Sequence, residues 1–206
     1  MSYLQNINSL GGDSNIGSLI SMQVARATDI ESMNDPDNDT VYGDIVFKAG
    51  KGFVTFGFTS ESPRFSSNGK DSQEGSLREN RLDFLLPRDA AVIRDILSRM
   101  EEDNFVVLYT DANGKQKVFG SPAFPVSFRY SRDSGARVSD LNHYACVFYS
   151  DGPENDFFYE GTITTAPAGA APVIIKVNGV VVTSAQPGDT VLFTSDFDFD
   201  FEIIAI

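Results

Sequence analysis

The sequence predicts a mainly β protein: an antiparallel β-sandwich or barrel with one flanking α-helix and a short C-terminal β element. Two observations support this fold class. Only one stretch, about residues 88–102, repeats apolar residues at helical spacing. Most of the remaining chain alternates short aromatic and β-branched stretches with Gly, Asn, Asp and Pro. At 206 residues and 41% hydrophobic content, the chain is long enough to bury one sizeable core.

The first third of the chain contains predicted strands, separated by polar segments. Residues 1–18 are polar and glycine-containing and are expected to form an extended arm, followed by a strand over Leu19–Ala27. Val41–Lys48 and Phe53–Thr59 are expected to pair around a turn at residues 49–52, because the second alternates with period two. Residues 60–79 are polar and predict a long loop, a kind of segment that is usually functional or disordered.

The middle of the chain predicts a strand, a helix, a strand and a hairpin return. Arg81–Leu86 is the first strand, and Pro87 stands where a helix can begin without losing a hydrogen bond. The apolar stripe of the helix, with Ile96 and Leu97 expected in the core, comprises Val92, Ile93, Ile96, Leu97 and Met100. Asn104–Thr110 is the next strand, and residues 111–114 form a turn.

Three aromatic-rich strands are expected after this unit, over Pro125–Arg132, Tyr144–Ser150 and Asp156–Ile163. The small, proline-punctuated residues 165–172 predict a linker between a core of residues 1–164 and a C-terminal element of residues 173–206.

The C-terminal element begins with a predicted hairpin. Val173–Val177 and Val180–Ser184 flank Asn178-Gly179, which suits a type I′ turn. Two further strands are expected over Thr190–Thr194 and Asp196–Ile204.

Charge and rare residues exclude several function classes. The chain has 16 basic and 29 acidic residues, a net charge of −13, which disfavours binding to duplex DNA or to an anionic membrane. His143 and Cys146 are the only histidine and cysteine. Three apart in a predicted strand, they should point to opposite faces and cannot form a nucleophile–base pair. We therefore expect a non-enzymatic protein without a cofactor or a metal site.

Two acidic segments allow more than one interpretation. Residues 34–39 resemble the start of a calcium loop, but the sixth position lacks glycine and the twelfth is Val46, so a solvated turn is favoured. Residues 196–203 alternate acidic and apolar residues, which puts Asp196, Asp198, Asp200 and Glu202 on one strand face. That face could be a solvated edge, a cation site or the wall of a channel. We favour the channel wall over the cation site.

Several local patterns carry a family resemblance. They are Val118–Pro122, Phe124-Pro125, Asp133–Gly135, Ser139–Tyr144 and Phe157–Gly161. In these five patterns the chain resembles small virion proteins from the tail-assembly regions of phages and prophages of Bacteroidetes. The order of elements is also similar to that of tail-tube proteins, which have two packed antiparallel sheets, a flanking helix and a long loop that reaches the next ring.

The resemblance implies a structural subunit of a phage tail, made in the host cytoplasm and located in the virion. Its partners would be other copies of itself, in rings or a tube, and other tail proteins. DNA would pass through the channel without specific binding. The candidate contacts between subunits lie in or beside the predicted loop, at Arg64, Phe65, Lys70, Gln73 and Leu77. A β-sandwich module that binds carbohydrate or mediates adhesion is the alternative.

Overall fold

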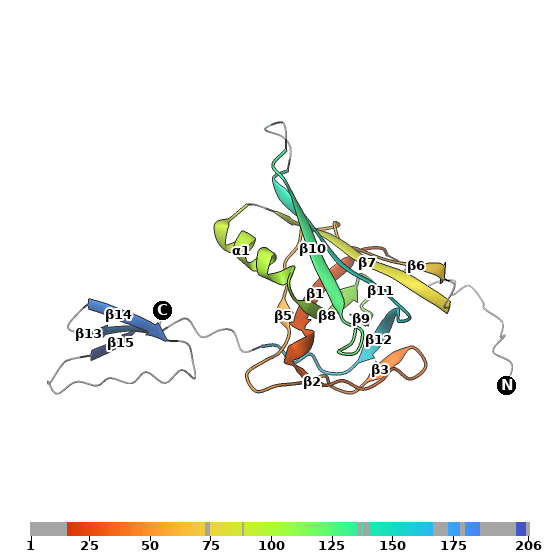
Figure 1. Ribbon diagram of the computed structural model, residues 1–206, viewed down its shortest axis with the longest axis horizontal. Coiled ribbons are helices and arrows are strands. Elements are labelled where there is room, and N and C mark those ends of the chain that lie inside the picture. The colour runs from red at the N-terminus through yellow and green to blue at the C-terminus, as the bar shows by residue number, and fades with distance from the viewer. Residues whose placement is uncertain are drawn as a thin grey trace.

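A ten-stranded sheet and one α-helix form the main body of the computed structural model (Figure 1). The structure describes residues 16–72, 75–87, 89–135, 137 and 141–166, with residues 71, 72, 75 and 76 and three C-terminal strands described by backbone alone. The strands of the large sheet are β1 Leu19–Arg26, β3 Thr40–Tyr42, β5 Val54–Thr55, β6 Arg64–Ser72, β7 Gly75–Pro87, β8 Asn104–Asp111, β9 Gln116–Phe119, β10 Val126–Asp133, β11 His143–Gly152 and β12 Asp156–Glu160. The predicted mainly β class with one helix is confirmed.

The sheet runs in the order β3-β12-β9-β8-β10-β11-β7-β6, with β1 paired to β8 and β5 paired to β1. Its pairs are antiparallel except that of β3 with β12, which is parallel and makes the sheet mixed. Two smaller sheets accompany it. One pairs β2 Ile30–Ser32 with β4 Val46–Phe47, and the other contains β13 Val173–Val177, β14 Val180–Ala185 and β15 Phe201–Ile204.

Strand β8 lies between the two core clusters of the body. One edge of β8 pairs with β1, while the other pairs first with β10 and then with β9. Phe105, Val107 and Tyr109 face one core cluster, and Val106 and Leu108 face a second. Because both faces of β8 are covered, five consecutive apolar residues are buried there.

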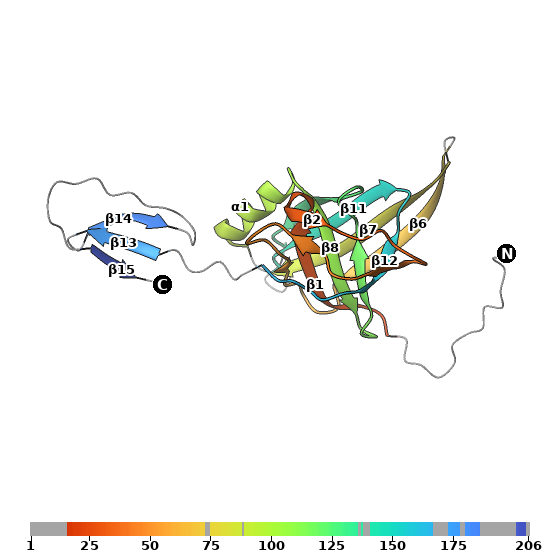
Figure 2. The same ribbon diagram turned by 90° about the horizontal axis from the view of Figure 1, so that it is seen from below.

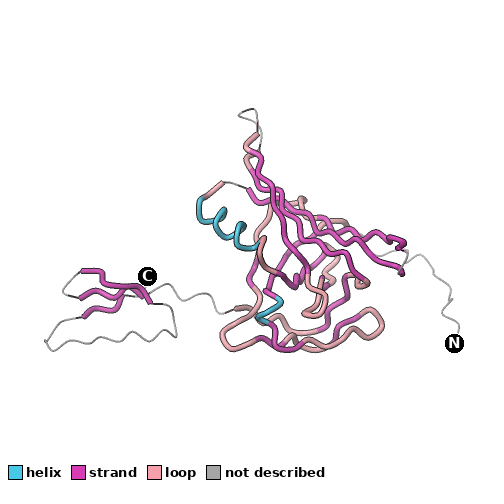
Figure 3. Tube along the Cα trace, in the orientation of Figure 1, coloured by secondary structure: helices cyan, strands magenta, loops and turns pink. Residues whose placement is uncertain are grey.

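Helix α1, Ala91–Met100, lies against β10 (Figure 3). Leu97 and Met100 reach the core, but Val92 and Ile96 remain 71% and 48% exposed. The prediction of Leu97 as a core residue is confirmed, and that of Ile96 is wrong, because only one side of the helix contacts the sheet. The helix also begins later than the predicted residue 88, since β7 continues through Pro87, which pairs with His143.

The predicted loop over residues 60–79 is wrong. Residues 64–72 form β6, which pairs with β7 from Arg64↔Asp83 to Ser72↔Gly75. The segment has little apolar periodicity because β6 is an edge strand, where polar residues are common and stability comes from pairing with β7. Both views show the hairpin extending past the rest of the body (Figures 1 and 2).

The predicted pairing of residues 41–48 with 53–59 is also wrong. β4 pairs with β2, and β5 pairs with β1. Phe53 instead forms backbone hydrogen bonds with residues 164 and 166. Its N–H donates to the Thr164 carbonyl at 2.9 Å, and the Ala166 N–H donates to the Phe53 carbonyl at 2.9 Å. A Cβ on Gly52 would lie 2.4 Å from the Ala166 nitrogen, so this contact requires glycine.

The C-terminal prediction is confirmed where it can be compared. β13 and β14 form the expected antiparallel hairpin, and β15 pairs with the other edge of β13. Thr165 and Ala166, expected in the linker, bond to the body through Phe53. The rest of the linker, Asn178-Gly179 and the predicted strand Thr190–Thr194 lie outside the described residues.

Candidate functional site

The predicted contact residues belong to the β6–β7 hairpin and differ in accessibility. Arg64 and Lys70 are exposed on β6, whereas Leu77 on β7 is half-buried. Phe65 turns inward, stacking on Tyr109 with ring centroids 5.6 Å apart and meeting the edge of Phe119. It anchors the hairpin to the core. Gln73 lies outside the described residues.

The acidic strand proposed to face a channel is only partly described. Asp196, Asp198 and Asp200 lie outside the described residues, and Glu202 is described by backbone alone, in β15 opposite Lys176 of β13. The choice between a solvated edge, a cation site and a channel wall stays a prediction.

His143 and Cys146 lie on β11 as expected, on opposite faces. Cys146 is buried among the core aromatics, and burial raises its pKa to about 12. The His143 ring lies on the other face, with Nδ1 3.0 Å from the Leu141 carbonyl oxygen. Cys146 is therefore poorly placed to form a thiolate nucleophile at neutral pH, and His143 lies on the wrong face of the strand to act as its base.

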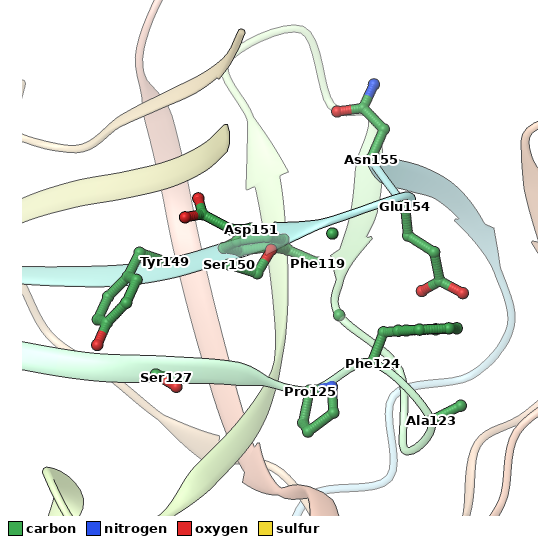
Figure 4. Close-up of a pocket in the computed structure, with 12 residues that line it drawn as sticks. Phe119, Ala123, Phe124, Pro125, Ser127, Tyr149, Ser150, Asp151, Glu154 and Asn155 are labelled. Carbon is green, nitrogen blue, oxygen red and sulfur yellow. The ribbon is translucent and has the colours of Figure 1, made fainter. Parts of the chain in front are cut away.

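A cavity of about 300 Å³ lies between residues 119–125 and the corner that joins β11 to β12 (Figure 4). Its walls combine aromatic and acceptor-bearing side chains: Phe119, Phe124, Tyr149, Asp151, Glu154 and Asn155. Figure 4 shows the Glu154 side chain extending toward the Phe124 ring. A second cavity of about 330 Å³ shares Ala123, Phe124 and Glu154 with the first and continues to Glu31 and Asp35.

No cationic side chain is among the described residues that line the first cavity. Within the described part of the chain, the Glu154 carboxylate accepts from the Ser121 hydroxyl at 3.1 Å and has no other hydrogen-bond or ion-pair partner. The buried Oδ1 atoms of Asn155 and Asn80 have no hydrogen-bond partner among the described residues. Asn80 is fully buried behind the cavity, and its Nδ2 donates to the Glu154 carbonyl at 2.7 Å.

Burial raises the pKa of Glu154 above its ordinary value, and the charge of Asp35 acts in the same direction, against the hydrogen bond from Ser121. An ionised carboxylate is therefore held here at some cost, with no cation beside it in the described structure. The cavity is suited to receive a positive group.

A buried acid nearby has such a cation. Asp156 accepts from the Tyr109 hydroxyl at 2.6 Å and from Lys117 Nζ at 3.0 Å. The same ammonium lies 5.0 Å from the centroid of the Phe158 ring. Burial, together with Asp156, raises the pKa of Tyr109, so its hydroxyl stays protonated and donates. This cluster joins β8, β9 and β12.

A second charged cluster fixes the start of α1. Asp89 accepts from the Tyr144 hydroxyl, binds Arg94 through both carboxylate oxygens at 2.8 and 3.0 Å, and lies 2.7 Å from Arg132. The hydrogen bond from Tyr144 has the largest effect on the pKa of Asp89 and lowers it. Burial acts in the opposite direction, and the guanidinium groups of Arg94 and Arg132 lower the pKa further. The cluster connects α1, β10 and β11.

The calcium-like segment over residues 34–39 is an exposed turn closed by an Asp37↔Thr40 bridge. The described residues contain no group of three or more His, Cys, Asp or Glu that could hold a metal ion. The solvated turn expected from the sequence agrees with this geometry.

The residues of the first cavity could not be predicted as a group from the sequence. Glu154 and Asn155 are 30 residues or more from Phe124, and no local pattern joins them. The available signal was Ser121–Pro125, in which two prolines flank an aromatic residue that is 48% exposed.

No family model, no curated protein and no solved structure matches this chain. In the described residues, no helix is both long enough and apolar enough to span a membrane.

Proposed function

We propose that this protein is a structural subunit of a phage tail that assembles with copies of itself through the free edge of β6. One observation supports the assembly most directly. β6 is nine residues long, about 30 Å at the usual rise per residue, and pairs with β7 alone in the described structure. The local sequence patterns that resemble tail-assembly proteins favour the phage tail as the setting.

An unpaired edge offers backbone donors and acceptors to another strand. Pairing with a neighbouring subunit satisfies them and adds a strand to its sheet. The end of the β6–β7 hairpin gives a second reason to expect a contact with a neighbour. Arg78 is the last β7 residue that pairs with β11, so Lys70↔Leu77 and the two pairs beyond it form a ribbon of two strands only. A two-stranded ribbon is marginally stable in water, so contact with a neighbour would stabilise this end.

A ring or tube built in this way would surround a channel. The net charge of −13 suits a channel that passes DNA, because attraction would retain the polymer. The same charge opposes close packing of subunits at low salt, so assembly should become stronger as salt screens the repulsion.

The test uses proline at two consecutive positions of β6, Ser67→Pro and Asn68→Pro. In an antiparallel strand, consecutive residues direct their N–H groups to opposite edges, so one variant loses a bond to β7 and the other loses only an outward donor. Light scattering and negative-stain images at low and high salt should show rings or tubes for the wild type. The variant that loses only the outward donor, called the outward variant, should melt like the wild type but remain monomeric.

Two results would contradict the proposal. If the outward variant assembles as well as the wild type, β6 is not the contact. A wild-type protein that stays monomeric at high concentration and high salt would favour the alternative, a module that binds carbohydrate or mediates adhesion.

A further inference from the structure

The cavity beside Phe124 has the composition of a site for a positively charged side chain. Its wall carries the Glu154 and Asp151 carboxylates beside the hydroxyl groups of Ser127, Tyr149 and Ser150. Among the described residues, no Lys, Arg or His side chain lines this cavity or the adjoining one. The Glu154 carboxylate accepts a hydrogen bond only from the Ser121 hydroxyl within the described chain, so a ligand with several donors is favoured.

We infer that this cavity binds an arginine side chain presented by a partner polypeptide. The guanidinium group is planar and carries five donors, which allows it to meet the Glu154 carboxylate while it stacks on the Phe124 ring, toward which Glu154 extends (Figure 4). The volume of about 300 Å³ is at the small end of ligand sites and suits a single side chain. The inference does not depend on self-assembly of the subunit.

The molecule already holds one cation by the same combination of groups. Lys117 lies between the Asp156 carboxylate, at 3.0 Å, and the face of Phe158, at 5.0 Å from the ring centroid. In the cavity, Glu154 and Phe124 are the corresponding carboxylate and ring, but the cation is missing from the described chain.

A metal ion fits the cavity less well. Calcium takes six to eight oxygen ligands, whereas two carboxylates line this cavity and no metal-holding group of acids is found in the described residues. The exposed Phe124 ring provides no ligand for a metal but does provide a stacking surface. The adjoining cavity along Glu31 and Asp35 offers a path for the rest of a peptide.

The probe is Nα-acetyl-arginine amide, titrated into the full chain and followed by chemical-shift changes in amide NMR spectra. We expect millimolar binding, with shifts at Phe124, Glu154 and Asn155. The citrulline amide, of nearly the same shape but neutral, should bind at least about tenfold more weakly, as should the Glu154→Gln variant, since a hydrogen bond to a charged group is lost. Phe124→Ala should also weaken binding.

The control variant is Glu160→Gln, which removes one exposed acid outside both cavities and should leave affinity unchanged. Glu154→Gln should melt no lower than the wild type at neutral pH, because its raised pKa makes the charged form unfavourable in the fold. Loss of binding in that variant then reports the site and not unfolding.

Nα-acetyl-arginine with a free carboxylate tests the source of the side chain. Its carboxylate should be repelled by Asp151 and Glu154, with no α-ammonium to offset the repulsion, so it should bind more weakly than the amide. Equal or tighter binding of Nα-acetyl-arginine would overturn the polypeptide partner. Equal binding of citrulline, full binding by Glu154→Gln, or no shifts at the cavity residues at tens of millimolar probe would overturn the site itself.

Discussion

At the scale of single residues, Asp89 is the side chain on which the attachment of α1 depends. Its side chain is only 16% exposed. It accepts a hydrogen bond from Tyr144 of β11 and forms ion pairs with Arg94 of α1 and Arg132 of β10. Asp95 on the same helix is a natural comparison, because its pair with Arg99 is 60% and 78% exposed. Exposed pairs of this kind contribute little to stability.

We therefore expect Asp89→Asn to lower the melting temperature clearly, whereas Asp95→Asn leaves it nearly unchanged. The cause is the loss of charge beside two guanidinium groups, which are then left without their carboxylate. Thermal unfolding followed by circular dichroism measures both variants, with the wild type as reference. Equal melting temperatures for the two variants would mean that the Asp89 cluster does not hold the helix.

The pH dependence of this effect has a definite sign. Because the pKa of Asp89 is lowered in the folded state, its stabilisation is fully present above the ordinary carboxyl range and is lost as the pH falls through the folded-state value. The difference in melting temperature between the wild type and Asp89→Asn should shrink in that acid range. A difference that grows on acidification would contradict the assignment.

At the scale of elements, α1 is held by fewer residues than its apolar stripe predicts. Leu97 is 1% exposed and lies in the core with Met100, while Ile96 is 48% exposed beside a groove formed with β1 and β5. Neighbouring positions of one helix therefore differ sharply in burial.

Leu97→Ala should lower the free energy of unfolding by about 2–5 kcal/mol, the usual cost of such a cavity in a core. Ile96→Ala should change it by less than about 1 kcal/mol, because little packing is lost and alanine is the better helix former. Urea unfolding of both variants gives the comparison. A larger loss for Ile96→Ala would mean that the helix packs through its other side.

At the scale of the whole molecule, Cys146 lies in the larger of the two core clusters. The residue lies in the interior part of β11, paired with Tyr130 of β10 and Phe84 of β7. Strands in such a position open only in large-scale unfolding. Burial also raises the thiol pKa to about 12, so almost no thiolate forms near neutral pH.

Alkylation of Cys146 should accordingly report global unfolding. With iodoacetamide at pH 8 the native protein should stay unmodified by mass spectrometry, while the urea-unfolded chain reacts at the rate of a free cysteine. In intermediate urea the rate should follow the fraction unfolded. Rapid labelling of the native protein would show that β11 opens locally.

The elements whose side chains are buried were predictable from the amino-acid sequence. β8, β11 and α1 were predictable because burial leaves a periodic pattern: a continuous apolar run for the strand covered on both faces, alternation for β11, and a spacing of three to four for the helix. The opposite orientation of His143 and Cys146 followed from the same periodicity.

The tertiary structure decided what carries no local pattern. β6 is polar because it is an edge, so its strand character comes from pairing with β7 and not from its own residues. The burial difference between Ile96 and Leu97 depends on where the helix meets the sheet. The cavity joins Phe124 to Glu154 across 30 residues, and its charge matters because folding removes water and places no cation beside it in the described chain. Periodicity records which face of an element is buried, whereas a site depends on which distant residues the fold brings together.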